Sequence, residues 1–182
     1  MSPTGTASGT GGVAGSFRGT YTHKVDAKGR VSVPAPFRRN IEAGDPAWNP
    51  DCGEQPRLIL VLGMHENNCL DCYTQADMAA LEERALASDD YDVRESFTEH
   101  VVANSIELRL DDNGRILLSP ALRRALGIEG EAVFVGKLDR FEIWAPAARE
   151  AHLSARQSAG DGLGRRDMLR RLMRQKRPGA EG

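Results

Sequence analysis

The chain has 182 residues, of which 40% are hydrophobic and 27% charged, and its formal net charge is −2. This composition is typical of a folded protein with a core of its own and argues against a largely disordered chain. No apolar run reaches the roughly 18 residues that span a bilayer, and the first residues lack the basic and apolar regions of a secretory signal. We therefore expect a cytoplasmic protein of one or two small domains with no membrane partner.

The chain offers few residues for metal binding or catalysis. Its three cysteines, Cys52, Cys69 and Cys72, are too few and odd in number for a disulfide framework, and the single C-x-x-C pair has no second pair to complete a zinc site. Its four histidines are scattered, and no phosphate-binding or nucleophile motif occurs. We predict that the protein is not an enzyme and has no catalytic residue, metal, cofactor or small-molecule substrate.

The first predicted elements form a tight turn between two strands. Residues 1–16 are rich in glycine, serine and threonine and are predicted to be a disordered tail. A strand then leads into Asp-Ala-Lys-Gly, in which Asp26 and Gly29 suit the first and fourth positions of a type I turn. The return strand, 30–33, ends at Pro34 because proline cannot donate to a ladder. These residues predict a β-hairpin.

The rest of the first half adds a helix and two strands. A short helix is predicted at about 36–41, and a loop rich in proline, aspartate and asparagine follows at 45–57. Apolar residues at 58–63 and 69–73 then predict two strands. Helical spacing and a capping pair indicate a helical connector at 75–102.

The second half repeats the first. Residues 25–39 (VDAKGRVSVPAPFRR) correspond to residues 110–124 (LDDNGRILLSPALRR) at a constant offset of 85. The repeated turn positions are Asp26 and Asp111, Gly29 and Gly114, and Arg30 and Arg115. Two further predicted strands, 132–136 and 140–144, follow the second copy in the same order. Agreement of two motifs in one order indicates an internal duplication.

The duplication predicts the domain organisation. One hairpin with one helix buries too little apolar surface to be stable alone, so two modules are expected to interlock into one barrel. The fold class is then α+β, mainly β, with short helices. The expected boundaries are a first module at 17–74, a second at 103–146, the connector between them, and a C-terminal helix and basic extension at 147–182.

Charges are strongly segregated along the chain. Residues 17–39 carry six bases and one acid, a net of +5, whereas residues 71–99 carry two bases and nine acids, a net of −7. Residues 149–182 have nine bases and four acids, a net of +5. The first basic block surrounds the first tip (26–30), and the second tip (111–115) is its repeat. A narrow two-stranded tip fits a major groove, where arginine pairs with guanine and lysine suits phosphate.

These observations predict binding of double-stranded DNA through the tips. The predicted DNA-contacting residues are Lys28, Arg30, Arg115, Asn113, Lys24 and Arg18. The predicted structural turn residues are Asp26, Gly29, Asp111 and Gly114. We expect the first tip to make most of the contact, because the second follows two acids. In the alternative interpretation, each arginine is only solvated or paired with its aspartate.

The repeated motifs resemble the MraZ family of bacterial regulators, which contain two SpoVT/AbrB-like modules. The motifs are FRGTY at 17–21, VDAKGRVSVP at 25–34, LDDNGRILL at 110–118 and GKLDRFEIW at 136–144. The resemblance implies a duplicated swapped-hairpin AbrB-like β-barrel and a ring-shaped homo-oligomer. It implies a nucleoid-associated repressor that binds short direct repeats at its own promoter, upstream of the division and cell-wall gene cluster. It also assigns DNA contact to Lys28 and Arg30, with Arg115 as their counterpart.

Three other interpretations stay open at this stage. An oligomeric protein-interaction adaptor would use the acidic region 71–99 to bind a basic partner. The predicted helix at 165–177 is basic and amphipathic, and it would add phosphate affinity or bind another surface. Paired catalysis by Asp26 and Asp111 is the weakest alternative, because their place in the turns gives both aspartates a sufficient structural role.

Overall fold

The computed structural model describes residues 15–64, 68–159 and 164–174. The chain divides into two compact units, Met1–Arg149 and Glu150–Gly182. The predicted tail at 1–16 lies outside the described residues except for its last two. Within the described ranges, no helix has both the length and the apolar composition needed to cross a bilayer.

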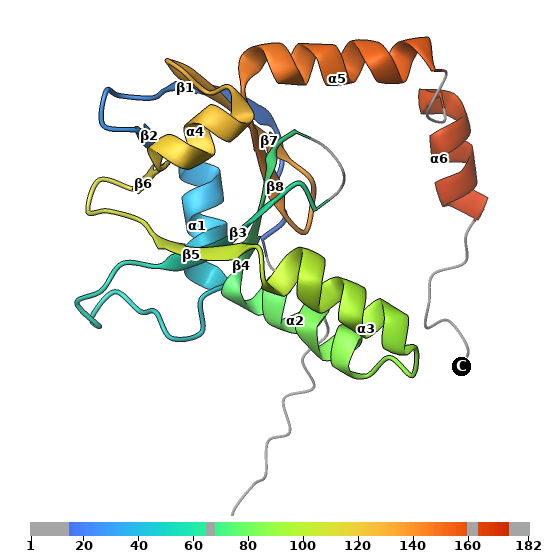
Figure 1. Ribbon diagram of the computed structural model, residues 1–182, viewed down its shortest axis with the longest axis horizontal. Helices are drawn as coiled ribbons and strands as arrows, with labels where there is room; N and C mark the ends of the chain where they lie inside the picture. Colours follow the sequence, from blue (N-terminus) through green and yellow to red (C-terminus); the bar gives the residue numbers. More distant parts are fainter. Residues whose placement is uncertain (1–14, 65–67, 160–163, 175–182) are drawn as a thin grey trace, which may run out of the picture. The chain divides into compact units, whose positions relative to one another are not determined.

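The two halves of the first unit contain the same elements in the same order (Figure 1). The first half contains β1 (Thr20–Lys24), β2 (Arg30–Ser32), α1 (Ala35–Ala43), β3 (Arg57–Leu62) and β4 (Leu70–Thr74). The second half contains β5 (Ser105–Arg109), β6 (Arg115–Leu117), α4 (Pro120–Leu126), β7 (Glu131–Gly136) and β8 (Phe141–Trp144). The duplication inferred from the repeated motifs is therefore present in the order of elements, and the class is α+β as predicted.

The remaining elements are helical. Between the halves lie α2 (Gln75–Leu86), α3 (Tyr91–Phe97) and the π-helical turn η1 (Thr98–Val102). After β8 come α5 (Pro146–Ser158) and, in the second unit, α6 (Arg165–Arg174). Local chemistry sets several ends: the Thr74 hydroxyl accepts a hydrogen bond from the Asp77 N–H at the start of α2. Gly127 ends α4 in the left-handed conformation, which glycine adopts without a side-chain clash.

The strands are exchanged between the halves. The six-stranded sheet has the order β1-β7-β8-β4-β3-β5, so the first strand of each half pairs with the third strand of the other. The two second strands, β2 and β6, form a separate antiparallel pair in which Val31 lies opposite Ile116. The result is an approximate twofold arrangement of the two repeats.

The prediction of local hairpins is wrong beyond the turns themselves. A single bridge between Val25 and Val31 joins the segments on either side of the first turn, and β1 and β2 then enter different sheets. The barrel is also not closed: the six-stranded sheet of the described residues ends at β1 and β5. The short second strands bury their central apolar residues against each other across the halves, since Val31 lies opposite Ile116 and each is 1% exposed.

The core draws on both halves of the chain. Phe37 of α1 packs against Phe141 of β8 with ring centroids 5.1 Å apart, and Phe17 lies 5.0 Å from the same ring. These rings and the residues at the β2–β6 crossing, Val31 and Ile116, are at most 1% exposed. Because the apolar contacts cross between halves, neither half has a complete core of its own.

We expect substitution of Ile116 by alanine to lower the free energy of unfolding by about 2–5 kcal/mol, because a fully buried side chain leaves a cavity at the crossing of the two halves. Urea denaturation followed by circular dichroism measures this loss. Leu117→Ala is the matched control, since Leu117 is the next residue on β6 and is 55% exposed; we expect a loss below about 1 kcal/mol. Equal losses for both variants would contradict the assigned core.

Candidate nucleic-acid interface

Asp26 organises the first tip. The Gly29 N–H donates to the Asp26 carbonyl over 2.8 Å and closes the turn. One carboxylate oxygen of Asp26 accepts the backbone N–H groups of Lys28 and Arg30 at 3.0 and 2.9 Å. The other accepts Nε of Arg30 at 2.6 Å. Gly29 has φ +89°, which a residue with a side chain rarely adopts.

The second tip repeats this arrangement. Asp111 accepts the backbone N–H groups of Asn113 at 2.8 Å and Arg115 at 3.0 Å, and its other oxygen accepts Nε of Arg115 at 2.7 Å. Both arginines are therefore paired with their aspartates, as the alternative interpretation of the sequence proposes. The pairing engages Nε, one of five guanidinium N–H groups, and 39% of the Arg30 side chain stays exposed. An arginine held in this way is also a pre-oriented donor.

The hydrogen bonds at both tips favour ionised aspartates. The backbone N–H of Arg30 and then its guanidinium lower the pKa of Asp26. Burial acts to raise the pKa of Asp111, but the N–H and guanidinium of Arg115 outweigh it, and that pKa is also lowered. Both ion pairs therefore exist at neutral pH.

Each tip packs against an arginine from the helix of the other module. A Cβ atom on Gly29 would overlap the Leu118 carbonyl oxygen and approach Nε of Arg123 to 2.9 Å. A Cβ atom on Gly114 would overlap the Arg38 side chain, whose Nη1 donates to the Asn113 carbonyl over 3.4 Å. Sequence reasoning did not assign Arg38 and Arg123 to the site. The feature of the sequence that points to both residues is the Arg-Arg pair that occurs at the same place in the two copies.

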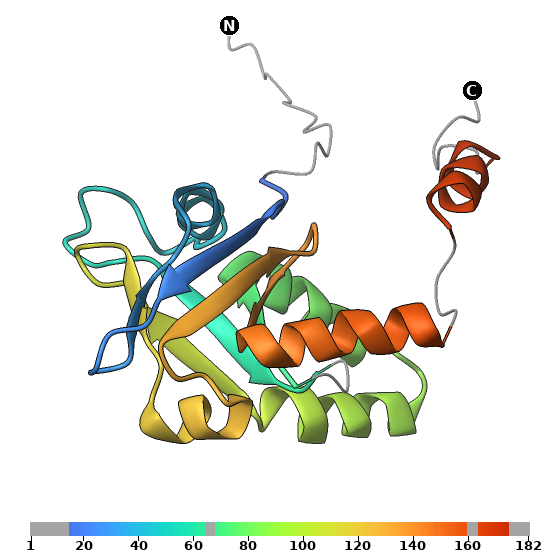
Figure 2. The ribbon, with the colours of Figure 1, turned by 90° about the horizontal axis from the view of Figure 1, so that it is seen from above.

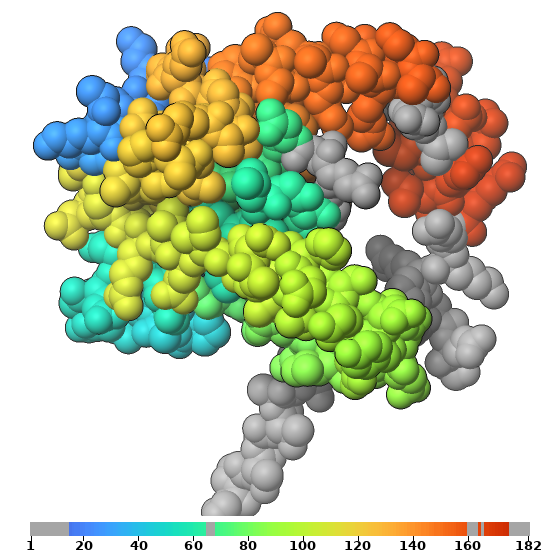
Figure 3. All heavy atoms as spheres, in the orientation of Figure 1, coloured from blue at the N-terminus to red at the C-terminus, as the bar shows by residue number. Residues whose placement is uncertain are grey.

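The backbone also ties each tip to the other module. The Leu118 N–H donates to the Gly29 carbonyl at 2.9 Å, and the Val33 N–H donates to the Gly114 carbonyl at 3.0 Å. The position of one tip therefore depends on the return strand of the other. Both tips reach the surface at the same side of the unit, as Figure 2 and Figure 3 show.

The structure gathers most, but not all, of the predicted contact residues. Lys28 lies exposed at the first tip, and Lys24 lies exposed at the end of β1 beside it. Arg18 precedes the other end of β1, where its Nε donates to the Ser16 hydroxyl over 2.7 Å. The strand β1 lies between Arg18 and Lys24 and spans about 13 Å from Thr20 to Lys24. Arg18 therefore does not join the first tip.

The 45–57 insertion is an ordered loop that lies beside the second tip. Asp45 is buried and binds Arg57 through both carboxylate oxygens, at 2.9 and 3.0 Å, which closes the loop. The Gln55 amide donates to the Asp112 carboxylate over 3.1 Å, and Glu54 pairs with Arg109. The second tip thus has acidic neighbours.

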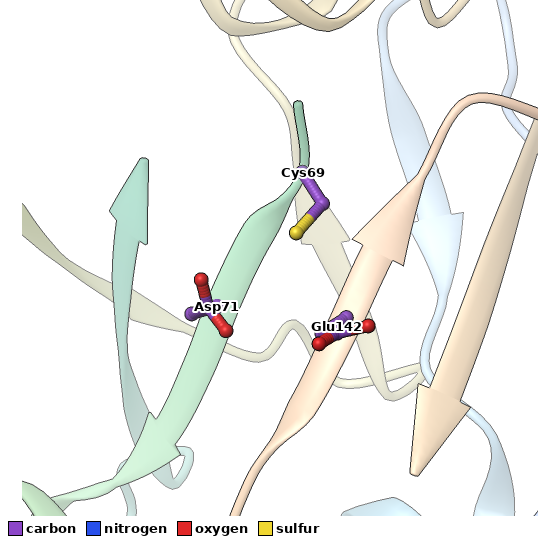
Figure 4. Close-up of side chains that lie close together, drawn as sticks. All are labelled: Cys69, Asp71 and Glu142. Atoms are coloured by element: carbon purple, nitrogen blue, oxygen red, sulfur yellow. The ribbon is translucent and has the colours of Figure 1, made fainter. Parts of the chain in front are cut away.

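A buried cluster of Cys69, Asp71 and Glu142 lies where β4 meets β8 (Figure 4), with potential ligand atoms within 4.8 Å of one another. Arg140 binds Asp71 at 3.0 Å, and Lys137 binds Glu142 at 3.3 Å, so two bases already balance the two carboxylates. Burial and the nearby Asp71 raise the pKa of Cys69 to about 12, whereas a metal needs the thiolate. These residues fit a structural ion cluster better than a metal site.

Comparison with known proteins shows one family. The family described as "MraZ protein, putative antitoxin-like" matches residues 16–96 and 101–162. A protein of Cereibacter sphaeroides named "Transcriptional regulator MraZ" is 40% identical over 153 residues, which cover 80% of this chain and 89% of that protein. Proteins of the same name from a Ruegeria species and Acidithiobacillus ferrooxidans are 38% and 37% identical, covering 74% and 81% of this chain and 80% and 94% of their own lengths.

We expect Gly29→Ala to destabilise the protein more than Gly127→Ala. Both glycines have positive φ, but a Cβ on Gly127 would meet nothing within 4 Å. Gly127→Ala therefore measures the backbone strain alone, about 1–2 kcal/mol. Gly29→Ala adds the overlap with the Leu118 carbonyl, which we expect to cost at least about 1 kcal/mol more. Equal losses in urea denaturation would show that the tip does not approach the other module as described.

We also expect Arg30→Gln to raise the pKa of Asp26, measured by carboxyl-carbon NMR, while leaving it below its ordinary value because the backbone N–H still donates. A lowered folded-state pKa stabilises the fold above the unfolded value of about 3.9. That stabilisation is lost as the pH falls through the folded-state pKa. The pKa of Asp111 is the internal control and should not move. An unchanged pKa of Asp26 would contradict the ion pair.

Proposed function

This chain belongs to the MraZ family, and from that premise we propose that it is a sequence-specific DNA-binding transcriptional regulator that contacts DNA through its two tips. The observation that carries the proposal is the repeated tip, in which an aspartate orients an arginine at 2.6 and 2.7 Å. Both tips lie at one side of the unit. Its relatives are named as transcriptional regulators.

The first tip has the chemistry that base recognition needs. The bond from Arg30 to Asp26 restricts a long side chain before binding, which lowers the conformational entropy cost when the guanidinium meets guanine O6 and N7. Lys28 and Lys24 are exposed beside it and suit phosphate oxygens. We propose that Arg30 reads a base and that the two lysines contact the backbone.

The second tip plays the lesser part in this proposal. Arg115 is oriented as Arg30 is, and Asn113 is exposed at the turn. However, the exposed Asp112 lies within this tip and disfavours close approach of phosphates. Arg115 and Asn113 would therefore add specificity at a second position, with little affinity of their own. Arg18 lies before the other end of β1, so it would contact only DNA that extends past the site bound by the tips.

We further propose the assembly that the family resemblance implies. The exchange of first strands and the β2–β6 pairing support a swapped-hairpin AbrB-like fold. A ring-shaped homo-oligomer would present one pair of tips per copy, which suits short direct repeats because successive copies share one orientation. The proposed regulator is cytoplasmic and nucleoid-associated, and represses its own promoter and the division and cell-wall gene cluster.

Binding to the DNA upstream of the protein's own gene tests this function by gel shift. We expect Arg30→Ala to lower specific affinity by about 1–3 kcal/mol for each base that the guanidinium reads. Arg30→Lys keeps the charge and a partner for Asp26 but removes the planar fork, so it should also reduce specificity. Lys28→Ala should instead lower the salt slope by about one and weaken all sequences alike.

The matched control is Arg84→Ala, which removes an exposed arginine from α2 in the acidic connector and should leave binding unchanged. Circular dichroism checks that each variant is folded. Specific binding that survives Arg30→Ala would remove Arg30 from the interface. Wild-type protein that shows no salt-dependent binding at all would contradict the DNA-binding proposal, because phosphate contacts release counterions.

A further inference from the structure

An apolar groove lies between the helices that connect the two modules. Its volume is about 310 Å³. It is lined by Glu82, Ala85, Leu86, Arg94, Phe97, Thr98 and Val102. Glu82, Ala85 and Leu86 belong to α2, and the other lining residues belong to α3 and η1, so two packed helices form the walls of this α2–α3 groove.

Large apolar side chains of the α2–α3 groove are exposed to solvent. Leu86 is 77% exposed and Val102 is 42% exposed, although both lie in helices whose other faces pack on the core of the unit. Tyr91 and Val93 of α3 are also exposed, at 63% and 51%. A contiguous apolar surface with a polar rim is typical of a site that another protein surface covers.

The surroundings of the α2–α3 groove select a basic occupant. Residues 75–102 contain eight acids and two bases, a net charge of −6 if histidine is neutral. Such a field attracts cations and repels DNA, and it is separate from the tips, where the bases gather. The occupant must therefore combine positive charge with an apolar stripe.

The α6 helix has both properties. Its ten residues carry five arginines and one aspartate, a net of +4. Four apolar residues of α6 follow the i, i+1, i+4, i+5 spacing of one helical face, and the arginines lie outside this apolar stripe. That stripe comprises Met168, Leu169, Leu172 and Met173, each at least 40% exposed. Alone in water, a helix of this length is marginally stable, so burial of the stripe would also stabilise it.

We propose that α6 of one copy binds in the α2–α3 groove of a second copy. The apolar stripe would fill the groove between Leu86 and Val102, while the arginines would pair with Glu82 in the lining and with the exposed acids of α2 and α3 around the groove. The α6 helix belongs to the second unit of the chain, whereas the groove belongs to the first. The helix lies beyond residue 162, where the match to the family ends, so the proposed contact lies outside the part of the chain that the family model describes.

Disulfide trapping between two full-length variants tests the proposal without DNA. Both variants carry Cys52→Ser, since Cys52 is exposed whereas Cys69 and Cys72 are buried. One also carries Met173→Cys on α6 and the other Leu86→Cys in the α2–α3 groove. We expect their mixture to form a covalent dimer under mild oxidation. Adding Leu172→Glu to the α6 variant, or raising the salt concentration, should lower the yield to that of a control pair.

The control pair combines Met173→Cys with Thr22→Cys, an exposed position on β1 away from the groove. A yield equal to that of the control pair would overturn the proposal. A chain carrying both Met173→Cys and Leu86→Cys that closes only within itself would also overturn it, in favour of an intramolecular contact. A weaker salt dependence of DNA binding in Arg170→Glu/Arg171→Glu, with no change in trapping yield, would instead assign α6 to DNA.

Discussion

The exchange of strands between two homologous halves is the constraint on which the rest of the structure depends. The first strand of each half completes the sheet of the other, and β2 pairs with β6 where Val31 faces Ile116. A three-residue strand forms few ladder bonds and cannot support a hairpin by itself. The two halves therefore become ordered together, with one shared core in place of two small ones.

The candidate interface follows from this exchange. Each turn is organised locally by its aspartate, but its glycine backbone bonds to the return strand of the other half and packs near an arginine from the other half's helix. A change in one half is thus felt at both tips. Such coupling holds the two tips in a defined arrangement before binding. Less conformational entropy is then lost when both tips bind, which favours affinity.

Charged residues are also separated between different parts of the first unit. A chain with net charge −2 separates a basic tip from an acidic helical connector, so one side can approach a polyanion while the other disfavours it. The buried charges, in contrast, are paired with opposite charges. Asp71 and Glu142 lie opposite each other where the halves meet, and Arg140 and Lys137 form ion pairs with them. Buried carboxylates are tolerated at such a position only because bases and hydrogen bonds compensate for the loss of hydration.

The sequence by itself determined the duplication, because the two copies repeat the same motifs in the same order. It also determined the turn chemistry of Asp26 and Gly29, because a turn depends on neighbours within a few residues. Only the tertiary structure decided which strands pair: β1 and β5 pair with strands of the other half where the turns alone predicted local hairpins, and the described sheet ends at β1 and β5 where a barrel was expected. It also separated Arg18 from the first tip and brought Arg38 and Arg123 to tips of the opposite half. Strand pairing depends on which long-range contact buries most apolar surface, and residue spacing alone does not encode that comparison.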